Sequence, residues 1–159
     1  MRAAVLTISD GVARGERDDG SGDALEELLT GEGFEVVRRV VPDDRAEIAG
    51  ALRELARTSR LVLTTGGTGL APRDVTPEAT ADVLDRPAPG IAEALRADSI
   101  TKTPHGLLGR GLAGTVGSTL VVNLPGSTGG CRDGFAVLQP ALAHALGLLA
   151  DKTTEHRQT

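Results

Sequence analysis

The chain has 159 residues, of which 40% are apolar, with a formal net charge of −5 and a pI near 5.2. This length suits one domain with a hydrophobic core, and an acidic chain lacks the basic surface that nucleic-acid binding normally uses, so we expect no nucleic-acid partner. Two Phe and no Trp or Tyr leave Leu, Val, Ile and Ala to fill the core, and a single cysteine excludes an internal disulfide and a cysteine-built zinc site.

The sequence shows no targeting or membrane-spanning feature. No apolar run approaches the ~20 residues of a membrane span. The N-terminus passes directly into a predicted strand, without the apolar segment and cleavage site of a signal peptide. The three histidines are far apart and have no metal-ligand spacing. We therefore expect a cytoplasmic protein that binds no membrane.

The first part of the chain alternates two predicted strands with two predicted helices. Residues 3–8 are mostly apolar, which is typical of a strand buried on both faces. A glycine- and charge-rich loop then leads to a helix that begins near Ser21. The second strand covers residues 34–41, and the next helix starts at Asp44, which with Glu47 forms an N-terminal capping pair.

The rest of the chain continues this alternation. In chain order we expect a strand at 61–65, helices at 77–85 and 91–101, a short strand near 113–116, a strand at 119–124 and a helix at about 132–149. Pro140 lies within the last helix and should break or kink it. Residues 1–150 are therefore predicted to form a single domain, and residues 151–159 a frayed polar tail.

This order of elements predicts an α/β fold, a three-layer sandwich with a mostly parallel central sheet and helices on both faces. In such sheets ligands bind beyond the carboxyl ends of the strands. Four predicted strands end in polar, turn-rich loops: Ser9-Asp10-Gly11, Pro42-Asp43-Asp44, Thr65 to Gly69, and Asn123 to Gly126. The sequence thus predicts one site assembled from four loops.

The most informative stretch is residues 64–80, Thr-Thr-Gly-Gly-Thr-Gly-Leu-Ala-Pro-Arg-Asp-Val-Thr-Pro-Glu-Ala-Thr. Its glycines can adopt positive φ, and successive N–H groups of such a turn can bind an anion, phosphate above all. Thr76-Pro77 is a typical helix start with a hydroxyl N-cap. The stretch matches neither the dinucleotide-binding fingerprint nor the P-loop. The alternative interpretation is a tight turn between strand and helix.

Carboxylates stand beside these anion binders. Arg73 and the glycine loop favour a phosphate, whereas Asp10, Asp74 and one of Asp43 and Asp44 would repel it. Mg²⁺ between them resolves this conflict, which predicts a metal-assisted reaction on a phosphate or nucleotide. Each carboxylate also has a structural interpretation: Asp10 as a turn residue, Asp44 as a helix cap, and Asp74 as a partner of Arg73 or a support of the helix start.

Other charged and polar residues are interpreted as structural. The side chains of Arg14, Arg96, Lys102 and Arg110 are each expected to be solvated charges rather than ligand contacts, and Cys131 a small packing residue.

The chain resembles the molybdopterin adenylyltransferase (MogA/MoaB) family of molybdenum-cofactor biosynthesis over about residues 3–148. The run from Thr64 to Thr80 looks like the family signature. Further matching motifs follow in order: Ile8-Ser9-Asp10, Asp19-Gly20-Ser21-Gly22, Val41-Pro42-Asp43-Asp44, Pro89-Gly90, Arg96, Thr103-Pro104, Arg110, Ala113-Gly114 and Asn123-Leu124-Pro125-Gly126. The chain departs from the family at Gly109, where relatives often carry Ser, and after Gly126, where many carry a second proline two residues on.

The resemblance implies a function and a set of site residues. The reaction is that of MgATP with molybdopterin, giving adenylyl-molybdopterin and pyrophosphate, in a homotrimer or dimer of trimers that hands its product to the molybdate-inserting enzyme. Asp74 matches the catalytic aspartate and Asp43 a second functional one, both binding Mg²⁺ through the ATP phosphates. The expected substrate-binding residues are Ser9, Asp10, Thr65, Gly66, Gly67, Thr68, Gly69, Arg73, Asn123, Pro125, Gly126 and Ser127.

Two other functions stay open at this stage. One is a non-catalytic molybdopterin-binding paralogue or carrier with the same pocket, because the signature does not separate such members from the enzymes. The other is an assembly component that stabilises an oligomer around another enzyme of the pathway.

Overall fold

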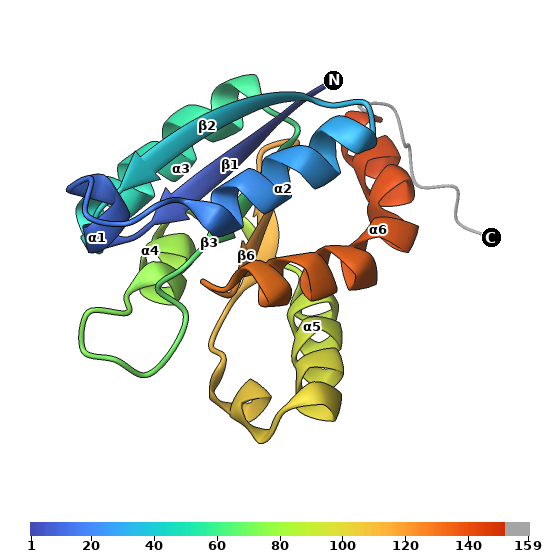
Figure 1. Cartoon of the computed structure of the whole chain (residues 1–159). Coiled ribbons are helices and arrows are strands. Elements are labelled where there is room, and N and C mark those ends of the chain that lie inside the picture. Colours follow the sequence, from blue (N-terminus) through green and yellow to red (C-terminus); the bar gives the residue numbers. More distant parts are fainter. Residues whose placement is uncertain (152–159) are drawn as a thin grey trace.

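The structure, a computed structural model, describes residues 1–151. Its centre is a six-stranded sheet in the order β2-β1-β3-β6-β5-β4 (Figure 1). The strands are β1 (Arg2–Ile8), β2 (Glu35–Val41), β3 (Leu61–Thr65), β4 (Arg86–Pro87), β5 (Ala113–Val116) and β6 (Thr119–Leu124). Strands β1, β2, β3 and β6 pair in parallel, whereas β5 and β4 run antiparallel at one edge. The mostly parallel α/β sheet predicted from the sequence is confirmed.

Helices cover both faces of this sheet. They are α1 (Asp10–Ala13), α2 (Gly20–Gly31), α3 (Arg45–Thr58), α4 (Thr76–Val83), α5 (Pro89–Lys102), the 3₁₀ helix η1 (Pro104–Leu108) and α6 (Thr128–Ala150). One apolar core lies between the sheet and α2, α5 and α6, and a second lies between the opposite face and α3 and α4. These two cores make the predicted three layers (Figure 1).

The three adjacent strands in the middle of the sheet, β1, β3 and β6, are covered on both faces. This burial explains why their sequences are mostly apolar and do not alternate with polar residues. Every residue of β3 and β6 is buried, and so is every residue of β1 after Arg2. Strands covered on both faces gain from apolar side chains in either direction and do not alternate. The core is aliphatic as expected, with Phe135 as the one aromatic residue among its buried side chains.

The last helix differs from its prediction at its start. It begins four residues earlier, at Thr128, because the Ser127 hydroxyl caps it by accepting the Gly130 N–H at 3.0 Å. Pro140 does not end it, although Figure 1 shows that α6 bends along its length. Of the two outcomes expected at Pro140, the bend agrees with a kink, and the helix does not break there; the apolar residues on either side, Leu138 and Leu142, are both buried in the core.

By length and composition α6 would qualify as a membrane span, which no apolar run in the sequence had suggested. In the structure its inward side is buried in the core of the domain; the buried residues are Cys131, Gly134, Phe135, Leu138, Leu142 and Leu146. One side of α6 is thus packed against the core, and 22% of its span-like window is buried.

Candidate active site

The carboxyl ends of the four parallel strands meet at one edge of the sheet. Ile8 at the end of β1 is in register with Val41 of β2, and Thr65 at the end of β3 is in register with Leu124 of β6. The loops that follow these residues therefore lie side by side. Because the chain runs from β1 out to β2 and then returns to β3, this edge also holds the switch in strand order at which α/β proteins bind ligands.

The glycine loop after β3 has a conformation that requires glycine. Gly66 and Gly67 have φ values of 99° and 67°, in the left-handed region that side chains disfavour. A Cβ on Gly66 would lie 2.2 Å from the Ile8 carbonyl oxygen. A Cβ on Gly67 would lie 2.3 Å from the Thr76 hydroxyl. The loop therefore packs directly against the end of β1 and the start of α4.

Thr76 anchors this loop instead of capping α4. The predicted hydroxyl N-cap was wrong, since the N-cap residue is Val75 and Thr76 is fully buried. Its hydroxyl donates to the Gly66 carbonyl at 2.9 Å, and its backbone N–H donates to the Gly67 carbonyl at 3.1 Å. Both glycine carbonyls are thus held toward α4, which fixes the orientation of the peptide groups in the loop.

Asp10 and Asp43 hold the loops after β1 and β2 together. Each carboxylate accepts the other residue's backbone N–H, both at 3.0 Å. Arg73 lies against Asp10, with Nε 2.6 Å from Oδ2, and also donates to the Asp43 carbonyl. The Arg73 guanidinium and the Asp43 N–H lower the pKa of Asp10, whereas burial and the charges of Asp10 and Asp74 raise the pKa of Asp43.

A polar cavity of about 570 Å³ opens between these loops and carries Asp43 and Asp74 on its wall. One carboxylate oxygen of Asp43 accepts the Asp10 N–H, and one of Asp74 accepts the Ala71 N–H at 3.0 Å. Asp44 instead caps α3 by accepting the Glu47 N–H at 2.9 Å, as the sequence predicted. Of the two neighbouring aspartates, Asp43 is therefore the one that faces the cavity.

A second, more apolar cavity of about 460 Å³ lies on the other side of the segment that follows β6. Ala92, Leu95 and Leu124 contribute to its apolar wall, and Arg96 and Lys102 bring cations to it. Ser127 lines both cavities, so the two are neighbours across one short loop. The sequence indicated the polar cavity but not this one, because much of its wall comes from one side of α5, from η1 and from the first turns of α6.

The predicted site residues divide between the two cavities. The polar cavity is lined by Ser9, Asp43, Thr65, Gly66, Gly67, Asp74, Gly126 and Ser127. The apolar cavity is lined by Thr68, Asn123, Pro125 and Ser127. Asp10, Gly69 and Arg73 line neither, and they contact the residues that do.

Two of these residues join elements through buried side chains. Asn123 donates to the hydroxyls of Thr64 and Thr80, both at 3.0 Å, and accepts the Leu112 N–H at 3.0 Å. Thr65 donates to the Pro125 carbonyl at 2.8 Å. A buried amide with every group paired fixes its neighbours, because leaving any partner unpaired costs free energy.

Arg110 is a residue whose role the sequence did not reveal. It was expected to be solvated, but it is half-buried, with Nε donating to the Gly69 carbonyl and a terminal nitrogen to the Asp74 carbonyl, both at 2.8 Å. Its other terminal nitrogen pairs with Glu78 at 2.8 Å. Arg110 thus clamps both ends of the 69–74 segment that carries Asp74. Arg96 was also misinterpreted, since it donates to the Gly111 carbonyl at 2.9 Å.

Replacing Arg110 with Met should lower the free energy of unfolding by about 1–3 kcal/mol, because two carbonyls and a carboxylate lose a charged donor. It should also speed proteolytic cleavage within residues 69–74. Urea unfolding and limited proteolysis measure the two effects. Arg57→Met, at an exposed position of α3, is the control and should change stability by less than about 0.5 kcal/mol. Equal effects of the two substitutions would contradict the clamp.

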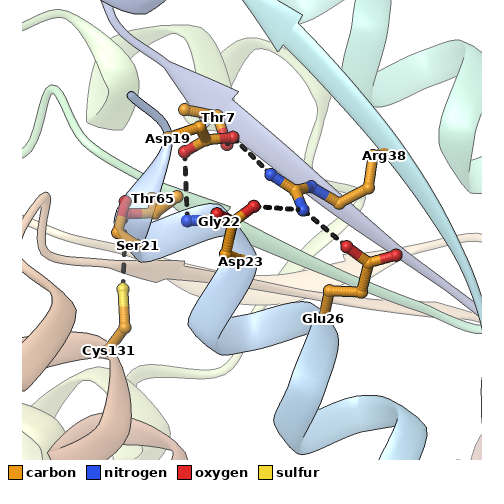
Figure 2. Close-up of polar contacts among 9 residues, drawn as sticks. All are labelled: Thr7, Asp19, Ser21, Gly22, Asp23, Glu26, Arg38, Thr65 and Cys131. Atoms are coloured by element: carbon orange, nitrogen blue, oxygen red, sulfur yellow. Dashed lines mark hydrogen bonds and ion pairs between the residues drawn. The ribbon is translucent and has the colours of Figure 1, made fainter. Parts of the chain in front are cut away.

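Cys131 lies beneath the site, where its thiol is 3.3 Å from the Thr65 hydroxyl (Figure 2). The thiol is also 3.2 Å from the Pro125 carbonyl. It is fully buried, and burial raises the pKa of the thiol to about 11. We expect no reaction with a disulfide reagent at pH 8 in the folded protein and full reaction in 6 M guanidinium, because thiolate and access are both required. Rapid labelling of the folded protein would contradict this packing role.

These features define a class: an α/β domain whose ligand site lies at the carboxyl edge of a mostly parallel sheet. Residues 4–144 match the family described as "Probable molybdopterin binding domain". The chain is 42% identical over 131 residues to the molybdopterin adenylyltransferase of Escherichia coli, covering 79% of this chain and 67% of that protein. It is 41% identical over 149 residues to a molybdenum cofactor biosynthesis bifunctional protein of Synechococcus elongatus, covering 92% of this chain and 47% of that protein.

The fold agrees with these relatives. The crystal structure of the molybdopterin biosynthesis enzyme MoaB from Thermus thermophilus superposes with a TM-score of 0.87 and 48% identity, over 93% of this chain and 95% of that one. The chain spans 22% to 48% of the length of four longer curated relatives. It belongs to the MogA/MoaB-like molybdopterin-binding domain family of molybdenum cofactor biosynthesis.

Proposed function

We propose that the chain is a molybdopterin adenylyltransferase, which converts MgATP and molybdopterin to adenylyl-molybdopterin and pyrophosphate. The observation that carries the proposal is the pair of carboxylates, Asp43 and Asp74, on the wall of one polar cavity beside the glycine loop. Relatives named molybdopterin adenylyltransferase support the choice of reaction.

The residues present fit a magnesium ion that arrives with a nucleotide. Within residues 1–151 no group of three or more His, Cys, Asp or Glu side chains is arranged to bind a metal. Mg²⁺ is commonly held by one or two carboxylates together with substrate phosphates and water. Asp43 and Asp74 would be those carboxylates, since each uses one oxygen for a backbone N–H and retains a second oxygen. Bound there, the ion would offset the repulsion between the carboxylates and the phosphates.

The reaction exchanges one phosphorus–oxygen bond for another. A terminal phosphate oxygen of molybdopterin attacks the α-phosphorus of ATP, and the bond from that phosphorus to the oxygen bridging to the β-phosphate breaks. Pyrophosphate leaves with the negative charge. In this scheme the loop of Gly66 and Gly67 holds phosphate through its backbone, and the Arg73 guanidinium neutralises Asp10 next to Asp43.

Two neighbouring cavities suit two substrates. We assign the nucleotide phosphates to the polar cavity, where the carboxylates lie, and a planar heterocycle to the apolar cavity. Ser127 lines both cavities and would lie near the point where the reacting phosphates meet.

The test is pyrophosphate release from MgATP on addition of molybdopterin. Because the chain has no Trp or Tyr, pterin fluorescence can be followed with little protein background. Release that requires both substrates and Mg²⁺ supports the transferase. Pterin binding without release would instead support the non-catalytic carrier, and binding of neither substrate would support an assembly component.

We further propose a cytoplasmic homotrimer or dimer of trimers that hands its product to the molybdate-inserting enzyme. The support for the hand-over is that relatives include bifunctional proteins of molybdenum cofactor biosynthesis, about half of whose length the chain spans. Light scattering tests the assembly, and a monomer would contradict it.

A further inference from the structure

Asp19 is a carboxylate of the polar cavity that is held on several sides. It lines the cavity together with Asp18, Asp43 and Asp74. Its Oδ1 accepts the Gly22 N–H at 3.0 Å, and its Oδ2 accepts the Thr7 hydroxyl at 2.7 Å. Its side chain is only 12% exposed. Asp19 thus caps α2 and joins the first turn of that helix to β1 (Figure 2).

Arg38 on β2 completes this arrangement. One terminal nitrogen of its guanidinium donates to Asp19 Oδ2 at 2.5 Å, and the other donates to Asp23 and Glu26 of α2 at 3.0 and 2.6 Å (Figure 2). The two residues pack so closely over Gly22 that a Cβ there would lie 2.3 Å from Asp19 Oδ2 and 2.5 Å from the Arg38 nitrogen. Glycine at position 22 is what allows the pair to form.

The Asp19–Arg38 pair lies next to residues that form one wall of the polar cavity. Gly20 and Ser21, the first residues of α2, line the polar cavity. The Ser21 hydroxyl lies 3.0 Å from that of Thr65, which holds the segment after β6 through the Pro125 carbonyl. Arg38 itself does not line the cavity. A displacement of the first turn of α2 would therefore move one wall of the site.

The positive charge of Arg38 also affects the electrostatics of the polar cavity. Of the four carboxylates that line the polar cavity in the described chain, Asp19 is the one with a guanidinium within hydrogen-bonding distance. Without Arg38, Asp19 would present an uncompensated negative charge to any polyanion that enters. With Arg38, part of the Asp19 charge is offset by a guanidinium that Asp23 and Glu26 share, while Asp43 and Asp74 have no guanidinium from residues 1–151 on their carboxylates.

We propose that Arg38 is a positioning residue for the binding of a magnesium–nucleotide: it fixes the wall formed by the first turn of α2 and offsets the charge of Asp19. This inference rests on the proposed function in so far as the polyanion is ATP. Arg38 acts through Asp19 and does not touch the substrate.

The test compares Arg38→Met with Arg39→Met. Arg39 is the next residue of β2, but its side chain lies on the opposite face of the sheet, where it pairs with Glu54 of α3. The two substitutions remove the same group from adjacent positions. Calorimetry with MgATP should show about tenfold weaker binding for Arg38→Met and nearly unchanged binding for Arg39→Met, with the difference shrinking at high salt. Equal binding by the two variants would overturn the proposal.

Substitution of Asp19 separates the charge effect from packing. Asn caps helices as well as Asp does, so its amide oxygen can still accept the Gly22 N–H. Its amide nitrogen then replaces the oxygen that accepts from Thr7 and Arg38. Asp19→Asn alone should lose less affinity for MgATP than Arg38→Met, because it breaks the contact with Arg38 but leaves no unpaired carboxylate at position 19. The double variant Arg38→Met/Asp19→Asn should recover part of the affinity that Arg38→Met loses. A double variant as weak as Arg38→Met would overturn the charge effect. Asp19→Asn retains the Arg38 side chain, so its comparison with the wild type remains usable if Arg38→Met does not fold, and a loss of tenfold or more would overturn the charge effect.

A measurement made without ligand tests the positioning role of Arg38 independently of the proposed function. Hydrogen exchange of the Gly22 amide, which donates to Asp19, should be about tenfold faster in Arg38→Met and unchanged in Arg39→Met, since the cap loses its support. Unchanged exchange in both would overturn the positioning effect. If the wild type bound no MgATP, the proposed function would fall, and the positioning effect would be decided by this exchange rate.

Discussion

Replacing Asp74 with Asn is expected to slow pyrophosphate release by roughly two to three orders of magnitude, equivalent to ~3–4 kcal/mol of transition-state stabilisation. The amide oxygen of Asn can still accept the Ala71 N–H that Asp74 accepts at 3.0 Å, so the turn at residues 71–74 should persist. What is lost is the negative charge on the wall of the polar cavity. The measurement is the initial rate with saturating MgATP and molybdopterin, with circular dichroism to check the fold.

Asp44→Asn is the matched control for this substitution. It removes the same charge next to Asp43, but Asp44 is exposed and caps α3, and Asn is an equally good cap. We expect a rate close to that of the wild type. Unimpaired turnover in Asp74→Asn would remove Asp74 from the mechanism. Equal losses in both variants would mean that net charge, and not the position of Asp74, controls the rate.

Gly66→Ala should lower the free energy of unfolding by about 2–4 kcal/mol, because two costs add. A residue with a Cβ disfavours the φ of 99° found at this position. In addition, the new Cβ would lie 2.2 Å from the backbone oxygen of Ile8, so β1 and the glycine loop would have to move apart. Urea unfolding of the two proteins gives the difference.

Gly50→Ala is the control for the glycine loop. Gly50 lies within α3, and a Cβ there meets nothing within 4 Å. Alanine is favoured over glycine inside a helix, so this variant should be more stable by about 0.5–1 kcal/mol. The same change from glycine to alanine is thus expected to lower the free energy of unfolding at position 66 and to raise it at position 50. A loss below about 0.5 kcal/mol for Gly66→Ala would show that the loop relaxes without cost.

The sequence by itself determined the fold class and the edge of the sheet at which the candidate site lies. Apolar runs such as residues 61–63 indicated buried strands, and their alternation with helices indicated a parallel sheet. Parallel strands bring their carboxyl ends to one edge, so the meeting of the loops at Ser9, Asp43 and Gly66 followed from topology alone. The fold class and the direction of the strands depend on the order of the elements and on the spacing of apolar residues, and both can be read from the sequence.

Only the tertiary structure decided which polar side chains meet. Arg110 and Arg38 look like ordinary surface arginines in the sequence, yet one clamps the segment that carries Asp74 and the other holds Asp19. Thr76 looked like a helix cap and proved to be the anchor of the glycine loop. The partners of these side chains are 10 to 41 residues away along the chain. No local pattern encodes such contacts, because they depend on how the loops pack once the sheet has formed.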